Sequence, residues 1–367
     1  MRVVPLVFLL ATAIGWTAPP ELTLEIKDFA VLPVTGAIDG PGNSAGLLAR
    51  INFLRQEPGG KRRIFVNDLN GPLYIVDKDS KKATTYLDLN GFAGHPGIFH
   101  RMAIDQLLAS GFISFEFDPD YAHNGRFYTI HLEDPGLPES NLPDNKNFPG
   151  LKTTGYALSR PIQTFGTTER EAVLIEWTDT NISNSTFEGS AREVMRLQYS
   201  GRIHPMADLI FNPTARPGSP DWRVMYIATG DGGNGEQTTN VRNNPQRLDV
   251  LVGKILRILP DIKEQVNRST ISENGRYRIP SDNPFTLKAG ARKEIWAYGL
   301  RNPHRLAWDV DPAAKTDHLI AFVIGLRTWE TIDLIHKGAN YGYSRREGPQ
   351  QLNDDNTLTD PPEKRRI

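Results

Sequence analysis

The amino-acid sequence predicts an all-β fold, and three observations support this prediction. Gly (32 residues) and Pro (27 residues) are abundant in the 367-residue chain, which favours many turns and short elements over a helical bundle or coiled coil. Short runs rich in Ile, Val, Phe, Tyr and Thr alternate with turn residues, as expected of strands. A pattern of strand, turn and returning strand recurs along the chain.

The first apolar runs predict one small antiparallel sheet. Turn sequences containing Gly, Pro, Asn and Asp separate them. The expected strands are Arg50–Arg55, Arg63–Asn67, Leu73–Asp77 and Thr84–Leu89. Four short strands within about 40 residues match the size of one blade of a β-propeller.

A weak internal repeat extends this pattern. Paired strands begin near Phe115, Leu209 and Leu306, and in each copy the first strand runs into a proline turn before the second returns. The copies are further apart than one bare blade, so long insertions must separate them. Hairpins of a β-sandwich would give a similar pattern, so periodicity alone favours a propeller or barrel only slightly.

The insertions are expected to be mostly irregular. Asp134–Thr154 is rich in Pro, Asn and Gly and predicts an exposed loop, and Ile262–Ile279 has a similar character. Gly94–Gly111 contains a spacing of apolar residues that is compatible with a short helix.

Charge and cysteine content exclude several classes of function. The 42 basic and 43 acidic side chains give a net charge of −1, so no field of one sign exists to hold a nucleic-acid backbone or an anionic membrane. The absence of cysteine excludes disulfide scaffolds, thiolate zinc sites and cysteine nucleophiles. A phosphate-loop lysine, an HExxH motif and a dinucleotide glycine fingerprint are also missing.

The N-terminus is typical of an export signal. Arg2 supplies a positive start, Val3–Trp16 is almost wholly apolar, and small residues around it offer cleavage sites. The apolar run is short for a membrane span, and a buried first strand is the alternative interpretation. We therefore expect a signal peptide over residues 1–18, a single domain over residues 19–367, and a periplasmic or secreted protein.

Two segments in the middle of the chain contain residues suited to chemistry. His204 directly precedes an expected strand, where an imidazole is suited to act as a general base; an ordinary surface or capping histidine is the alternative. Asp231 lies in the glycine-rich segment Thr229–Gln237. Its carboxylate is suited to accept backbone N–H groups or to bind a cation, and a tight turn closed by an aspartate is the alternative.

Two later segments also contain candidate residues. Arg301 and Asn302 follow a strand and precede a proline. Arginine offers a planar fork of donors for an anionic or quinone oxygen, and the alternative is an arginine that pins neighbouring loop carbonyls. The aromatic residues of Trp329–Tyr343 are expected to pack between sheets rather than to touch a ligand.

In this order, these segments resemble the soluble glucose/sorbosone dehydrogenase family. Its members are six-bladed β-propeller quinoproteins that use pyrroloquinoline quinone (PQQ) and calcium to oxidise sugars. The resemblance spans residues 47–348 and implies a six-bladed β-propeller type of fold, with about four blades present in this chain. The segments that carry it are Ser110–Tyr121, Tyr226–Gly233, Gly253–Ile258, Pro280–Phe285, Ile295–Trp308 and Ile332–Gly342.

The resemblance also implies roles for single residues. His204 falls on the catalytic histidine, which would take the proton of the sugar C1 hydroxyl while hydride passes to the quinone. Arg301 and Asn302 fall on the pair that contacts PQQ, and Arg301 would stabilise charge on the quinone oxygen. Gly325 and Leu326 fall where two backbone carbonyls hold calcium.

The sequence departs from the family pattern in two ways. Residues that the family uses near the cofactor are replaced at Ala109, Met206, Ala207, Val323, Ile324 and Thr331. Only 24 residues follow Tyr343, where the family has about two further blades with basic side chains for the PQQ carboxylates. We therefore expect the chain to be a fragment or truncated product, or to be completed by another segment.

The resemblance implies a PQQ- and calcium-dependent oxidoreductase that oxidises the C1 hydroxyl of aldose sugars and passes electrons to an external acceptor. A non-catalytic β-propeller that binds a protein or a carbohydrate is the alternative. A calcium-dependent lactonase-type hydrolase is a third interpretation that rests on fold analogy alone. No nucleic-acid partner and no membrane span are expected, and the sequence leaves the sugar, the acceptor and the oligomeric state open.

Overall fold

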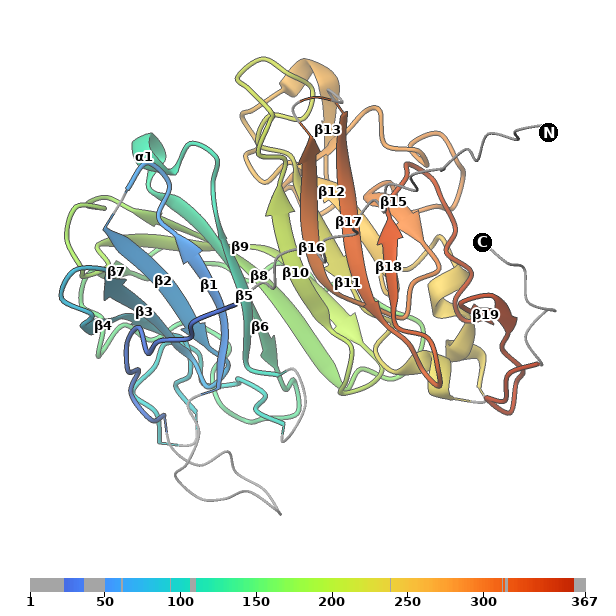
Figure 1. Ribbon diagram of the computed structural model, residues 1–367, viewed down its shortest axis with the longest axis horizontal. Helices are drawn as coiled ribbons and strands as arrows, with labels where there is room; N and C mark the ends of the chain where they lie inside the picture. The colour runs from blue at the N-terminus through green and yellow to red at the C-terminus, as the bar shows by residue number, and fades with distance from the viewer. Residues whose placement is uncertain are drawn as a thin grey trace, which may run out of the picture.

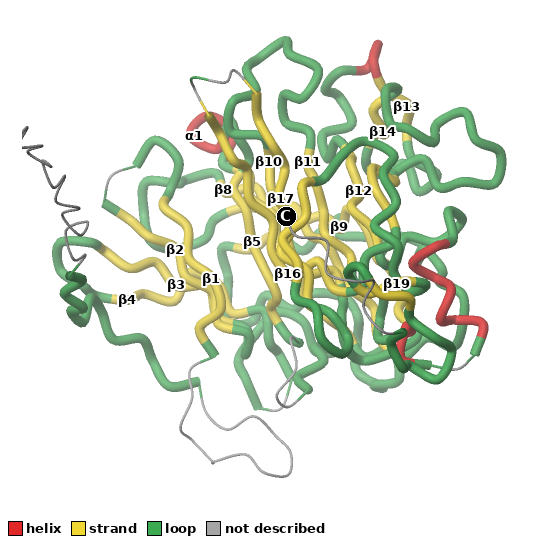
Figure 2. The backbone as a smooth tube through the Cα atoms, turned by 45° about the vertical axis from the view of Figure 1, so that its right-hand side comes forward, coloured by secondary structure: helices red, strands yellow, loops and turns green. Residues whose placement is uncertain are grey.

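The computed structural model describes residues 23–35, 50–60, 62–92, 94–105, 110–237, 239–311, 313 and 316–359. Strands dominate this part of the chain, and helices form only short segments at its edges (Figure 2). These are α1 (Tyr121–Asn124) and the 3-10 turns η1 (Asn234–Glu236), η2 (Asn240–Gln246) and η3 (Val266–Arg268). None of the described helices is long and apolar enough to cross a membrane. The predicted signal peptide lies outside the described residues.

The N-terminal half forms two sheets, drawn in blue to green in Figure 1. The first has the order β1-β2-β3-β4, with strands β1 (Ile51–Gln56), β2 (Arg63–Asp68), β3 (Pro72–Asp77) and β4 (Ala83–Asp88). The second is antiparallel except at its last pair, with the order β5 (Phe112–Phe117), β6 (Arg126–Glu133), β8 (Arg170–Asp179), β9 (Gly189–Tyr199) and β7 (Leu151–Lys152). Each strand predicted for the first sheet begins and ends within one residue of an observed strand.

The C-terminal half adds two sheets and two small hairpins. The third sheet has the order β10 (Met206–Phe211), β11 (Met225–Thr229), β12 (Lys254–Ile258) and β15 (Ile295–Tyr298). The fourth has the order β16 (Asn302–Asp311), β17 (Thr316–Ile324) and β18 (Thr331–Leu334). The hairpins are β13 (Ser269–Ile271) with β14 (Arg278–Pro280), and β19 (Arg346–Glu347) with β20 (Gln350–Gln351). The prediction of an all-β propeller-type fold with about four blades is thereby confirmed.

Two expectations for the insertions were wrong. The described part of Gly94–Gly111 is not helical, because Phe99 and Met102 are fully buried and form isolated β-bridges, Phe99 to Asn90 and Met102 to Glu133 of β6. Tertiary burial has overridden the local helical spacing there. The segment Ile262–Ile279 is not a plain loop, since it contains the β13–β14 hairpin.

Three hydrophobic clusters fill the seams between neighbouring sheets. The seam between the first and second sheets is aromatic, with Phe65 packing edge-on against Tyr86 and Phe117. The next two seams are mainly aliphatic. A strand that lies between two seams, such as β8, has buried side chains on both of its faces, and its sequence is therefore rich in consecutive apolar residues.

A buried carboxylate joins three sheets at the centre of the molecule. Asp208 on β10 is fully buried; its Oδ1 accepts a hydrogen bond from Ser114 Oγ on β5 (2.8 Å), and its Oδ2 accepts one from the Leu306 amide on β16 (3.0 Å). Arg305 of β16 donates to the Ala207 carbonyl (3.2 Å) and to Asn52 Oδ1 of β1 (2.7 Å). These bonds fix the first strands of all four sheets relative to one another.

A buried ammonium group fixes the loop that enters the third sheet. Lys254 is fully buried, and its Nζ donates to the carbonyls of Asn244 (3.0 Å), Pro245 (3.0 Å) and Val252 (2.6 Å). All three donors of the ammonium are thus used, although burial lowers the pKa of Lys254 well below its usual value. The loop before β12 is therefore held firmly beside the glycine-rich segment that ends β11.

Replacing Asp208 tests the central junction. Asp208→Ala leaves a buried hydroxyl and a buried amide without their acceptor, so we expect a loss of about 2–4 kcal/mol in the free energy of unfolding. Asp309→Ala is the control. Asp309 lies exposed on β16, the strand whose Leu306 amide bonds to Asp208, and its replacement should change stability by less than about 0.5 kcal/mol. Chemical denaturation measures both, and equal effects would contradict the assigned role.

The first sheet contains a carboxyl group whose protonation links stability to pH. Burial raises the pKa of Asp88 to about 7; the Asn90 amide opposes this rise, and the charge of Asp68 adds to it. Because the folded protein holds this proton more tightly than the unfolded chain, Asp88 stabilises the fold at low pH and loses this contribution as pH rises through about 7. We expect Asp88→Asn to remove about 2 kcal/mol of the stability difference between pH 5 and pH 8. Denaturation curves at both pH values measure this, with exposed Asp79→Asn as the unaffected control.

Candidate functional site

The centre of the candidate site is a histidine–aspartate pair. His204 precedes β10, and its Nδ1 lies 2.7 Å from Oδ1 of Asp231, which follows β11. Because an ionised carboxylate offers only acceptors, Nδ1 carries the proton of the neutral ring and Nε2 has the free lone pair. No side chain or backbone group in the described part of the chain forms a hydrogen bond to Nε2.

Asp231 also connects this pair to the fourth sheet. Its side chain is fully buried; Oδ1 accepts from the Gly233 amide (2.9 Å), and Oδ2 accepts from the Gly235 amide (2.8 Å). Its own backbone amide donates to the carbonyl of Arg301 (2.7 Å). The structure therefore brings His204 and Arg301, 97 positions apart in the sequence, to the two sides of one aspartate.

Glycines make this arrangement possible at two places. His204 has a φ of 53°, in the left-handed region, which is uncommon for a residue other than glycine. A Cβ at Gly230 would lie 2.4 Å from the His204 carbonyl oxygen, so only glycine allows the two turns to pack so closely. At Gly235, a Cβ would lie 1.9 Å from the hydroxyl of Tyr343.

The guanidinium of Arg301 is largely engaged within the protein. Its Nη1 donates to the carbonyls of Gly325 (2.5 Å) and Ile324 (3.2 Å), and its Nη2 forms an ion pair with Glu236. This geometry matches the alternative interpretation, in which the arginine pins loop carbonyls. The Nε of Arg301 and the Oδ1 of Asn302 are both buried and without a hydrogen-bond partner among the described residues, so one donor and one acceptor remain unused.

A cavity of about 280 Å³ lies beside Arg301, between the fourth sheet and the segment that follows it. Its lining includes Trp329, Tyr341 and Tyr343, together with the half-buried carboxylate of Asp333. Burial and the charge of Asp231 raise the pKa of Tyr343 above its ordinary value. The aromatic residues that were expected only to pack between sheets therefore also line the space next to Arg301.

A second imidazole lies close enough to His204 to interact with it electrostatically. Burial lowers the pKa of His304 to about 4, and the charges of Arg305 and His204 act in the same direction. His304 is consequently neutral at physiological pH.

The predicted calcium ligands are arranged differently from an oxygen cage. The Gly325 carbonyl already faces the Arg301 guanidinium, and the amides of residues 326–329 all donate to Oε1 of Glu347. Although burial acts in the opposite direction, these amides hold the pKa of Glu347 below its usual value. Among the described residues, no group of three or more His, Cys, Asp or Glu side chains is placed to hold a metal ion. The Gly325 carbonyl is therefore engaged by Arg301, and the calcium site at Gly325 and Leu326 stays a prediction.

One pairing and one functional candidate were missed in the sequence, although the expectation that Asp231 accepts backbone N–H groups agrees with its bonds to the Gly233 and Gly235 amides. Asp231 was considered as a turn or cation-binding residue, not as the partner of His204, because no local pattern links positions 27 residues apart. Glu236 was not considered at all. The only signal available was the density of glycines around Asp231, which indicates close backbone approach without naming the neighbour. Ala109 lies outside the described residues.

A comparison with protein families gives this geometry a context. Residues 196–358, which include both halves of the site, match the family model described as Glucose / Sorbosone dehydrogenase. This segment is similar to the glucose/sorbosone dehydrogenase family. The resemblance predicted from the motifs is thereby confirmed.

Similar curated proteins extend the match over more of the chain. The HIPL2 protein of Arabidopsis thaliana is 30% identical over 308 residues, which cover 80% of this chain and 40% of that protein. The aldose sugar dehydrogenase YliI of Escherichia coli strain K12 is 34% identical over 119 residues, which cover 32% of this chain and 25% of that protein. The chain spans about 40% of the length of the two HIPL proteins that it matches.

Similar solved structures support the propeller fold. The PQQ-bound aldose sugar dehydrogenase from Streptomyces coelicolor aligns with a TM-score of 0.51 at 21% identity, covering 86% of this chain and 69% of that one. A glucose dehydrogenase from Thermus thermophilus aligns with a TM-score of 0.53 at 19% identity, covering 82% of this chain and 66% of that one. At these identities, the likeness concerns the fold alone.

Asp231→Asn tests the central pair. An amide has one acceptor oxygen, so at least one of the three donors around Asp231 loses its partner; we expect a loss of about 1–3 kcal/mol in stability. We also expect ¹⁵N NMR to show a single Nδ1–H tautomer for His204 in the parent protein and a mixture in the variant.

The chain offers a matched control for this test. Asp120 accepts from Nδ1 of His123 at the same distance of 2.7 Å, but this histidine is 83% exposed. Asp120→Asn should therefore change stability by less than about 0.5 kcal/mol. A His204 tautomer that is unaffected by Asp231→Asn would show that the pair does not orient the ring.

Proposed function

We propose that this chain carries the substrate-oxidising half of a PQQ-dependent sugar dehydrogenase site, acting on the C1 hydroxyl of aldoses. The observation that carries the proposal is the His204–Asp231 pair beside Arg301, within a segment similar to the glucose/sorbosone dehydrogenase family. Aldose oxidation is named for one curated relative and for one structural neighbour. We extend aldose oxidation to this chain as a hypothesis.

His204 is suited to remove the hydroxyl proton. Asp231 holds Nδ1–H, so the free lone pair of Nε2 is available to accept a proton. As the ring becomes positive, the buried carboxylate stabilises it and fixes its orientation. The close packing of Gly230 against the His204 backbone keeps the imidazole in one place during this step.

Arg301 and Asn302 fit one edge of the cofactor. The unpaired Nε of Arg301 is a donor for an acceptor oxygen, and the unpaired Oδ1 of Asn302 is an acceptor for a hydroxyl. When bound there, PQQ supplies the acceptor for the hydride that leaves C1 as the sugar is oxidised to its lactone. Arg301 stabilises the negative charge that develops on an acceptor oxygen beside its guanidinium.

A non-catalytic binding role is the second candidate, and one observation favours it. Both Nη atoms of Arg301 are already held by Glu236 and by the carbonyls of the 324–325 segment. An arginine used in this way stabilises the loops and leaves less of its fork for a cofactor. Under this alternative, the cavity beside Arg301 would bind a carbohydrate or a peptide without redox chemistry.

Addition of PQQ to the purified protein separates the two candidates. We expect saturable PQQ binding by absorbance titration and aldose-dependent reduction of a redox dye, assayed with and without added calcium. His204→Gln should reduce turnover at least a hundredfold while PQQ binding changes less than threefold, because the base is lost and the cofactor contacts remain.

The exposed pair of His123 and Asp120 again provides the control. His123→Gln removes an exposed histidine that also bonds an aspartate, and it should leave both binding and turnover unchanged. Absence of both PQQ binding and dye reduction in the parent protein would reject the enzyme hypothesis. Equal loss of PQQ binding and turnover in His204→Gln would mean that His204 has a structural role.

A further inference from the structure

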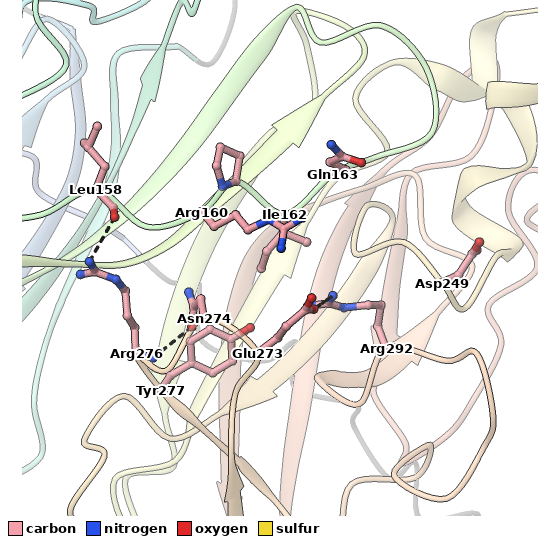
Figure 3. Close-up of a pocket in the computed structure, with 11 residues that line it drawn as sticks. Leu158, Arg160, Ile162, Gln163, Asp249, Glu273, Asn274, Arg276, Tyr277 and Arg292 are labelled. Carbon is pink, nitrogen blue, oxygen red and sulfur yellow. Dashed lines mark hydrogen bonds and ion pairs between the residues drawn. The ribbon is translucent and has the colours of Figure 1, made fainter.

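A second cavity lies on the seam between the second and third sheets, apart from the residues of the His204 site. Its volume of about 530 Å³ falls within the range of about 300–1,000 Å³ that is typical of small-molecule sites. Figure 3 shows that its lining comes mainly from residues 158–163 and from residues 273–277 with Arg292, and that Asp249 adds a further carboxylate. Neither segment takes part in the proposed oxidation.

Both walls of this cavity, which we name the seam pocket, are fixed by hydrogen bonds. Ile162 extends the edge of β9, with its amide bonded to the Arg196 carbonyl (2.8 Å) and its carbonyl to the Gln198 amide (3.0 Å). The tip of the β13–β14 hairpin is anchored to the second sheet, because Asn274 donates to Val194 and Arg276 donates to Glu193 and Leu158, all at backbone carbonyls (3.0–3.1 Å). A pocket with such walls is formed before any ligand arrives.

The lining has more free donors than free acceptors. Arg160 has an exposed side chain, and neither it nor Gln163 has a hydrogen-bond or ion-pair partner in the part of the chain that the structure describes (Figure 3). The two carboxylates are already paired, Asp249 with Arg247 (2.5 Å) and Glu273 with Arg292 (3.1 Å). Arg276 bonds only backbone carbonyls, so the guanidiniums of Arg160 and Arg276 are the cations of the seam pocket without a carboxylate partner among the described residues.

The deeper part of the pocket has the same bias toward donors. Arg292 Nε is buried and unpartnered among the described residues. Its Nη2 and the Tyr277 hydroxyl both donate to Glu294 (2.6 Å each), which fixes the ring of Tyr277 in the lining. The tyrosine ring and Ile162 add apolar surface to an otherwise polar cavity.

We propose that the seam pocket is a binding site for a small polyhydroxylated carboxylate, such as a sugar acid. A planar carboxylate matches the fork of Arg160 and supplies the acceptors that the lining lacks. Hydroxyl groups both donate and accept, so they suit the Gln163 amide and the exposed carboxylate of Glu273. The apolar face of a sugar ring fits against Ile162, which is half-buried in the lining. This proposal does not depend on the proposed oxidation.

Calorimetric titration of the full chain with D-glucuronate tests this proposal. We expect saturable one-site binding of glucuronate, and at least tenfold weaker binding of D-glucose, which lacks the carboxylate. Arg160→Gln should weaken glucuronate binding at least tenfold. Arg62→Gln should leave it unchanged, because Arg62 is comparably exposed, at 66%, but lies on the first sheet.

His204→Gln distinguishes the seam pocket from the candidate oxidation site. Glucuronate binding that persists in His204→Gln and is lost in Arg160→Gln supports the proposal. Binding that is lost in His204→Gln but kept in Arg160→Gln would place the sugar acid at the oxidation site and overturn it. Equal affinity for glucose and glucuronate, or no saturable binding of glucuronate, would also overturn it.

Discussion

The buried carboxylate of Asp231 is the group on which the candidate site depends. It accepts hydrogen bonds from the His204 ring and from two loop amides, and its own amide bonds the Arg301 carbonyl. An isolated carboxylate in a protein interior is costly, and it is retained where several donors compensate for its lost water. Here the donors that compensate Asp231, the His204 ring and two loop amides, belong to the candidate site itself. The free energy that keeps Asp231 buried therefore also holds the His204 ring and the Arg301 backbone against one residue.

The wider fold follows the same rule at its other seams. Asp208 joins three sheets and Lys254 closes a loop, and in both cases the buried polar group has partners for its donors or acceptors. Apolar packing brings the sheets together, but it is nearly indifferent to small sliding movements. Directional hydrogen bonds between sheets remove that freedom. The loops that carry His204, Asp231 and Arg301 are thus positioned by contacts within and between the sheets, and not by the loops alone.

How much of this could be predicted depends on whether the cause is local. The strands of the first sheet were predicted to within one residue, because alternating apolar side chains and turn residues act over a few positions. Arg301 and Asn302 were identified from their own segment and from a family resemblance. The pairing of His204 with Asp231 was not, since it arises only when two loops from neighbouring strands meet. The seam pocket is further from prediction still, because Arg276 reaches a sheet 83 positions away in the sequence.

Among the buried polar atoms of the site that have no hydrogen-bond partner in the described part of the chain, two lie on adjacent residues. An unsatisfied buried donor or acceptor costs about 1–3 kcal/mol, and the structure retains one of each at adjacent residues, Arg301 Nε and Asn302 Oδ1. The first lacks an acceptor and the second lacks a donor. A hydroxyl group both donates and accepts, so it can bond to either atom, whereas a carbonyl oxygen such as that of a quinone can bond only to Arg301 Nε. Under the proposed function, a quinone oxygen at Arg301 Nε and a sugar hydroxyl at Asn302 Oδ1 would together recover this cost.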